Sequence, residues 1–274
     1  TNTSRVRAIA LGDVNNFLIS DMDVHDRFTV FSSIILTSPE SEKTGFVGPT
    51  NGTIKDCSAF NADNGYGLVQ SHAAKSVLYE NLYALGGVAM RMECGVRPKD
   101  PKQKGGLFEV TERNIKCEDG YTALLLSPHS THCGVAAFDG VEAVGCEFAV
   151  KLTGGFISKR KKHEGDEPGS FAAGTTITNV RAVFGTNAQL SAKHLPYLPK
   201  RWRARVVPHE DLKMLRGPSI TAVLDHANYD VRLENVEAEG YKDIKPIITR
   251  DDAFQDAEIK EMARKYRRRN WKGN

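Results

Sequence analysis

An eight-residue pattern recurs seven times along this 274-residue chain, and it restricts the possible folds more than any other feature. Position three is always Ile, Val, Leu or Tyr, position five is Asp, Asn or Glu in six of the seven copies, and position eight is always apolar. The copies begin 25 to 36 residues apart, with one interval of 56. They read Phe17–Val24, Gly52–Ala59, Val77–Ala84, Phe108–Ile115, Asp139–Cys146, Thr175–Ala182 and Val231–Ala238.

The pattern is typical of a short strand that ends in a bend. The apolar residue at position three points into a core, and an Asp or Asn two residues later can hydrogen-bond neighbouring backbone groups in a turn. A second β-like run follows most copies, as in Gly67–His72, Val88–Glu93, Ala123–Ser127 and Phe148–Thr153. One unit cannot bury its apolar side alone, but stacked units form a continuous core. Helical repeats of similar period are excluded because helical apolar spacing is missing and β-branched residues, Asn and Gly are abundant.

The repeat therefore predicts an all-β fold, a right-handed parallel β-helix that forms a single domain over residues 1–274. Two segments interrupt it, a basic then acidic insertion at 156–174 and a Pro- and Arg-rich insertion at 193–218. The spacing of apolar residues predicts a C-terminal helix at about 251–268. Because the repeat begins almost at once, an N-terminal cap is expected to be missing from this sequence.

Composition restricts the function classes. No apolar run is long enough to span a bilayer. The net charge of +3 includes basic clusters at 159–162, 200–205 and 264–269, which favour a polyanionic partner. Nucleic acid is disfavoured because no base-stacking aromatics are interleaved with these clusters. The five cysteines lack C-x-x-C spacing, so neither a metal site nor a cofactor is indicated.

Aligning the second strands on their apolar residues predicts which side chains meet. Residues on successive coils lie about 4.8 Å apart, and inward and outward positions alternate along a strand. If Val69, Met90, Leu124 and Val150 point inward, Glu93 lies outward among cationic and hydrogen-bonding groups, where a carboxyl can serve acid–base chemistry. The predicted patch comprises Gln70, His72, Arg91, Glu93, Ser127, His129 and Lys151.

At these residues the chain resembles the iota-carrageenases, glycoside hydrolase family 82. The resemblance covers about residues 51–155 and is clearest at Gly67–His72 and Met90–Glu93. It implies a secreted, cell-surface or periplasmic endo-hydrolase that cleaves β-1,4 linkages of a sulfated galactan with inversion. Glu93 would be the general acid, Gln70 would hold the attacking water, and His129 would support the acid or the sugar. Position alone suggests that Arg91, His72, Lys151 and Ser127 contact the sulfated sugar.

One residue departs from that family. The resemblance leads us to expect an Asp two residues after the acid, as catalytic base, whereas this chain has Gly95. Two residues along a strand span roughly 6.6 Å, enough for a water between two carboxyls. The alternatives for the base are His129, Asp63 and Asp119. The substrate could also have shifted, for example to furcellaran.

Two other functions remain open. A polysaccharide lyase on the same fold would use a base such as His72, Arg91 or Lys151 and would release unsaturated products. A catalytically inactive polysaccharide-binding β-helix would account for Gly95. The oligomeric state is not indicated by the sequence.

Overall fold

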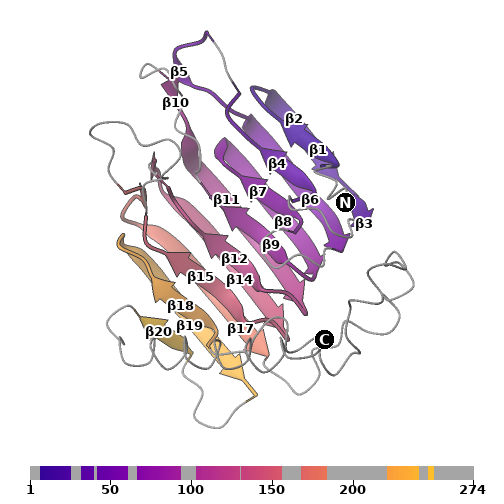
Figure 1. Ribbon diagram of the computed structural model, residues 1–274, viewed down its shortest axis with the longest axis vertical. Coiled ribbons are helices and arrows are strands. Elements are labelled where there is room, and N and C mark those ends of the chain that lie inside the picture. Colours follow the sequence, from indigo (N-terminus) through magenta and orange to yellow (C-terminus); the bar gives the residue numbers. More distant parts are fainter. Residues whose placement is uncertain are drawn as a thin grey trace, which may run out of the picture.

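The chain folds into stacked β-coils in which each coil gives one strand to each of two parallel sheets. This computed structural model describes residues 7–25, 32–39, 42–60, 67–93, 103–129, 131–155, 168–183, 221–240 and 246–249. Within these ranges every regular element is a strand, and no helix is long and apolar enough to cross a membrane. In Figure 1 the colours change smoothly along the stack, because coils adjacent in the chain are adjacent in space.

Two eight-stranded sheets make up the stack, and they are called sheet A and sheet B. Every neighbouring pair of strands in them is parallel. The strands of sheet A, in spatial order, are β1 (Ile9–Leu11), β4 (Ile34–Leu36), β7 (Val69–Ser71), β9 (Val88–Met92), β12 (Thr122–Leu126), β15 (Phe148–Thr153), β18 (Val223–His226) and β20 (Ile247–Thr249). Those of sheet B are β2 (Asn15–Ser20) and β3 (Asp23–His25), which both pair with β6 (Thr50–Phe60), then β8 (Ala73–Leu85), β11 (Gly106–Glu118), β14 (Ala136–Val144), β17 (Thr175–Val183) and β19 (Val231–Glu239).

Two short parallel ladders extend the coils at their edges. They pair β5 (Gly45–Phe46) with β10 (Gln103–Lys104), and β13 (His132–Cys133) with β16 (Ser170–Phe171). The strand β16 lies in the last part of the insertion predicted at 156–174, of which residues 156–167 are outside the described ranges. The insertion at 193–218 and the C-terminal helix predicted at 251–268 also lie outside them.

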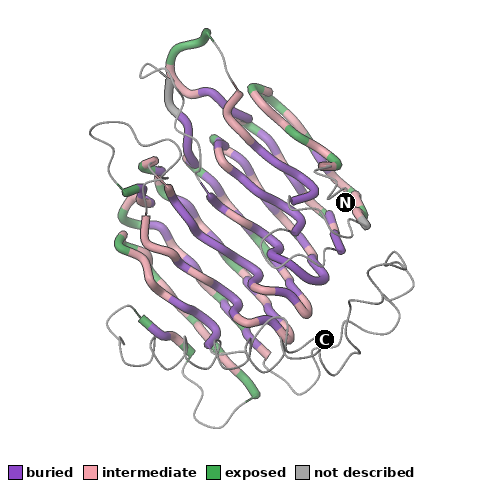
Figure 2. Tube along the Cα trace, viewed as in Figure 1, coloured by how far each residue is buried: buried purple, intermediate pink, exposed green. Residues whose placement is uncertain are grey.

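The prediction of an all-β parallel solenoid is confirmed, and its core lies between the two sheets. Apolar side chains from both sheets form one continuous cluster along the stack. Figure 2 shows this as long buried stretches on neighbouring strands of consecutive coils. The inward alignment of sheet A is also confirmed, since Val69, Met90, Leu124 and Val150 are register partners with no exposed surface. The right-handed sense of the coil stays a prediction, in keeping with the general rule for parallel crossovers.

The register predicted for sheet B is wrong in two of the seven copies. Val77 pairs with Val110 and not with Phe108, a slip of two residues. The fifth copy begins at Ala136, the partner of Val110, and not at Asp139, so its predicted start is three residues too late. In the true register, position three of the fourth copy is Glu112, which points into the core.

With that correction, position five becomes a column of left-handed backbone conformations. Its members have φ between 51° and 80°, and Asn and Gly tolerate this region better than other residues. The column is Asp21, Asp56, Asn81, Asn114, Gly140, Asn179 and Asn235. At the predicted position five, five of the seven copies have this left-handed conformation, whereas Glu112 and Ala143 do not, and the strands from β6 to β19 in sheet B continue through the position.

Side-chain amides link this column from coil to coil. Asn81 Nδ2 donates to Asp56 Oδ1 at 2.9 Å, and Asn114 Nδ2 donates to Asn81 Oδ1 at 3.1 Å. Gly140 interrupts the ladder, and Asn179 Nδ2 donates instead to Asp139 Oδ1 at 2.7 Å. Where the ladder is continuous, from Asp56 to Asn114, it links the left-handed position of one coil to that of the next.

Replacing Asn81 tests how much the ladder stabilises the fold. Asn81→Ala should lower the free energy of unfolding by about 2 kcal/mol, because it loses two amide hydrogen bonds and places a Cβ without local compensation at φ 52°. Asn81→Gly keeps the backbone conformation and should lose less. Chemical denaturation of both variants checks this. Equal losses in the two variants would mean that the left-handed backbone at position 81 adds nothing to the cost of the alanine substitution.

Candidate functional site

The outer face of sheet A presents the predicted patch as two columns of side chains. Gln70, Arg91, Leu125 and Lys151 are register partners in β7, β9, β12 and β15. The second column begins just past the strand ends, where the amide of Glu93 donates to Ser71 O at 2.9 Å. On the next coil, the amide of Ser127 donates to Met92 O, also at 2.9 Å, so Ser127 lies beside Glu93.

Glu93 is the centre of the cluster, and four side chains contact its carboxylate. Arg91 Nη2 lies 2.9 Å and His129 Nε2 3.4 Å from Oε1. Gln70 Nε2 donates to Oε2, and His72 Nε2 lies 3.3 Å from that same oxygen. These residues come from three consecutive coils and lie up to 59 positions apart in the chain. The sequence prediction that they meet is confirmed.

The cluster is almost closed to solvent. The side chain of Glu93 is only 10% exposed, and those of His72, Arg91 and His129 are 16 to 18% exposed. Burial alone would raise the pKa of Glu93, but His129, His72 and the guanidinium of Arg91 outweigh that effect. The pKa of Glu93 is therefore held below its usual range, and the group is a carboxylate in the free protein.

Lys151 lies apart from this cluster, two coils beyond Arg91 or about 10 Å along the stack. Its ammonium bonds the Tyr121 hydroxyl and lies 5.0 Å from the centre of that ring and 5.6 Å from the ring of Phe148. The two rings meet edge to face at 5.8 Å. Sequence reasoning missed Tyr121. Tyr121 could have been recognised from its position in the sequence, because it precedes β12 by one residue and Phe148 begins β15 on the next coil.

The alternatives for the base have different outcomes. Asp119 lies three residues before β12, whereas Ser127, the neighbour of Glu93, follows the end of that strand. The structure therefore does not bring Asp119 to the cluster. Asp63 and Gly95 lie outside the described residues. His129 contacts Glu93 directly, at a distance that leaves no room for the water an inverting pair encloses across about 6.5–9.5 Å.

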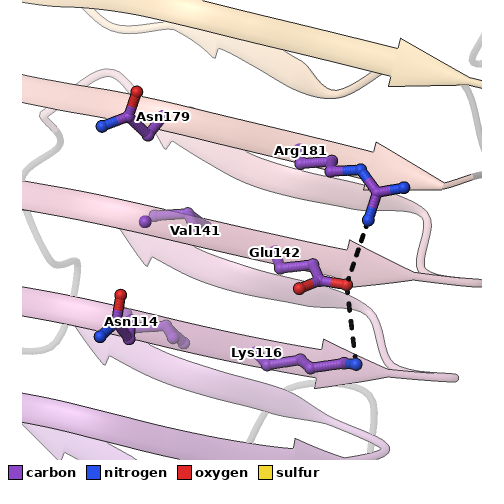
Figure 3. Close-up of a pocket in the computed structure, with 8 residues that line it drawn as sticks. Asn114, Lys116, Val141, Glu142, Asn179 and Arg181 are labelled. Carbon is purple, nitrogen blue, oxygen red and sulfur yellow. Dashed lines mark ion pairs between the residues drawn. The ribbon is translucent and has the colours of Figure 1, made fainter.

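The outer face of sheet B carries charge of a different kind. Lys116, Glu142 and Arg181 are register partners, and Glu142 Oε1 lies 3.6 Å from both cations (Figure 3). Lys116 also pairs with Glu118 at 3.0 Å, and Arg181 pairs with Glu239 at 3.2 Å. A hollow opens beside them, between Asn114 and Asn179, because Gly140 adds no side chain to the ladder there. Alternating signs cancel along the stack, so this face does not favour a polyanion.

No metal site emerges from the described ranges. They contain no group of three or more His, Cys, Asp or Glu side chains arranged to hold an ion. Four cysteines that the structure describes are buried thiols, Cys57, Cys117, Cys133 and Cys146.

Known proteins with similar sequences share one description. No family model matches the chain. An iota-carrageenase of Zobellia galactanivorans is 29% identical over 303 residues, covering 88% of this chain and 61% of that protein. An iota-carrageenase of Alteromonas macleodii is 28% identical, covering 83% of this chain and 59% of that protein. The chain is a relative of the iota-carrageenases.

Solved structures agree with this relationship. A 1,3-α-1,4-β-D-galactose-4-sulfate-3,6-anhydro-D-galactose-2-sulfate 4-galactohydrolase matches with a TM-score of 0.66 and 28% identity, over 85% of this chain and 62% of that one. An iota-carrageenase in complex with iota-carrageenan fragments matches with a TM-score of 0.66 and 26% identity, over 88% and 66%. The chain thus spans about three fifths of the length of the relatives that it matches in sequence.

Proposed function

We propose that this protein is a secreted, endo-acting glycoside hydrolase that cleaves β-1,4 linkages of a sulfated galactan with inversion. Its substrate would be iota-carrageenan or a related hybrid carrageenan or furcellaran. The observation that carries the proposal is the carboxylate of Glu93, contacted by Gln70 and His129 from the adjacent coils. The relatives named above are iota-carrageenases, and one solved relative is bound to iota-carrageenan fragments.

In this proposal each side chain has one role. Glu93 protonates the glycosidic oxygen as the bond to the anomeric carbon breaks, which contributes about 10²–10⁴-fold to such reactions. Gln70 holds the attacking water, and His129 orients the acid or the sugar. Arg91, His72, Ser127 and Lys151 contact the sulfated sugar, and no cofactor is required. Arg91 suits a sulfate because its planar fork of donors matches a tetrahedral anion.

A second candidate is a polysaccharide-binding solenoid without activity. One observation favours it: in the two outward columns of sheet A, which contain Arg91 and Glu93, the described residues include no carboxylate besides Glu93. An inverting hydrolase needs a base as well as an acid. This second candidate predicts tight binding of carrageenan without any fall in viscosity.

Incubation with kappa-, iota- and lambda-carrageenan and furcellaran tests the proposal. We expect new reducing ends and an early fall in viscosity on iota-carrageenan or furcellaran, because endo cleavage shortens chains before it releases small products. Products that absorb in the ultraviolet through a new double bond would instead assign the chain to the lyases. Binding without new reducing ends on any of the four polymers would favour the solenoid without activity.

A further inference from the structure

In the free protein Glu93 is a carboxylate, whereas its proposed role requires the protonated acid. A general acid must carry a proton before it can give one. Both oxygens of Glu93 accept contacts from positively polarised groups, and Arg91 is permanently charged. These groups favour the carboxylate over the acid. Something in the complex with substrate must therefore weaken one of these contacts.

Arg91 is the contact that an anionic sugar can most directly remove. It sits in the outward column of β9 and is 18% exposed, more than Glu93 at 10%. Its register partners on either side are the uncharged Gln70 and Leu125, and the anion that it contacts at 2.9 Å is Glu93. A sulfate that approaches this face meets the guanidinium and competes with Glu93 for its fork of donors.

We propose that a sulfate group of the substrate draws the Arg91 guanidinium away from Glu93, and that Glu93 takes up a proton from solvent as the substrate binds. This inference rests on the proposed function and deepens it, because sulfate would then control the acid and not only the affinity. Two further changes act in the same direction. Bound sugar shields the carboxylate from water, and the sulfate adds a negative charge nearby.

The groups that face Glu93 define what else could take up a proton. Arg91 comes from the same coil as Glu93, Gln70 and His72 from the preceding coil, and His129 from the following coil. Ser127 beside it is neutral, and the ammonium of Lys151 is held by Tyr121. Among the described residues that contact this carboxylate, the two imidazoles can also bind a proton, so the test must separate them from the carboxyl.

Isothermal titration calorimetry provides that test. A thio-linked iota-carrageenan oligosaccharide, which resists cleavage, is titrated at neutral pH in buffers of different ionisation enthalpy, alongside its desulfated counterpart. We expect uptake of about one proton per sulfated ligand bound, and none with the desulfated ligand. Glu93→Gln should abolish the uptake, and Arg91→Gln should reduce it by more than half. Glu142→Gln, on the opposite sheet, should match the unaltered protein.

The outcomes separate this inference from the proposed function. Binding of the sulfated ligand without proton uptake overturns the inference, even if natural carrageenan is cleaved. Uptake that persists in Glu93→Gln also overturns it and assigns the proton to the histidines. Full uptake in Arg91→Gln removes Arg91 from the switch. Release of reducing ends from natural iota-carrageenan, measured separately, tests the hydrolase proposal itself.

Discussion

Replacing Glu93 with Gln is expected to lower kcat on iota-carrageenan by about 10²–10⁴-fold, the contribution of a general acid. The amide keeps nearly the same shape and can still accept from Gln70 or Arg91, but it has no proton to give to the leaving oxygen. KM should change far less than kcat, because the loss falls on the transition state and not on substrate binding. Reducing-end assays under saturating substrate measure the effect.

A matched control separates this chemical loss from a general effect of neutralising a carboxylate. Glu142→Gln removes a charge from the outer face of sheet B, where Glu142 bridges Lys116 and Arg181 (Figure 3). That variant should keep full activity. If Glu93→Gln retained kcat within tenfold of the unaltered protein and folded normally, Glu93 would not be the acid.

The site on sheet A could be predicted because two signals agree there. Each strand contributes one apolar residue to the same inward column, which contains Val69, Met90, Leu124 and Val150. A slip of one residue in the register would turn that strand's apolar residue to solvent. The polar residues between them, such as Gln70 and Arg91, are then fixed on the outer face. Glu93 and its contacts follow from this alignment, although they are far apart in the chain.

Sheet B was misaligned because apolar residues fit two registers equally well. In the fourth copy Val110 and Ile115 satisfy positions three and eight of the pattern, whereas the true register places Glu112 at position three. No rule based on hydrophobicity would choose an ionisable residue for the core. The usable signal was the left-handed position, because Asn114 and Gly140 match Asn81 and Asn179 whereas Glu112 and Ala143 do not.

Glu112 itself leads to the second large effect, a loss of stability as pH rises. Its side chain has no exposed surface, and it lies in the inward column between Tyr79 and Phe138. Burial raises its pKa from 4.5 to about 9, although the backbone amides of Asp139 and Ile115 partly oppose this. The folded protein therefore holds a proton on Glu112 that the unfolded chain releases above about pH 4.5.

The direction of the pH dependence follows from proton binding. Between about pH 4.5 and pH 9 the folded state binds one more proton than the unfolded state, so the free energy of unfolding falls as pH rises. The stability contributed by the neutral carboxyl is fully present below pH 4.5 and is lost on approach to pH 9. The loss across this window is on the order of 6 kcal/mol, at 1.36 kcal/mol for each pH unit.

Glu112→Gln should remove this dependence, because an amide of the same size stays neutral at every pH in the window. Urea unfolding at pH 5, 7 and 9 measures it: the variant should be the more stable protein at pH 9 and lose little between pH 5 and 9. Glu142→Gln, which neutralises a carboxyl on the surface, should keep the slope of the unaltered protein.

The loss of stability also bears on the site. Tyr79, the neighbour of Glu112, bonds Ser71 across the core at 2.7 Å, and Ser71 lies between Gln70 and His72. A slope in Glu112→Gln equal to that of the unaltered protein would show that Glu112 is already ionised in the fold, and that the core of the solenoid accommodates its charge.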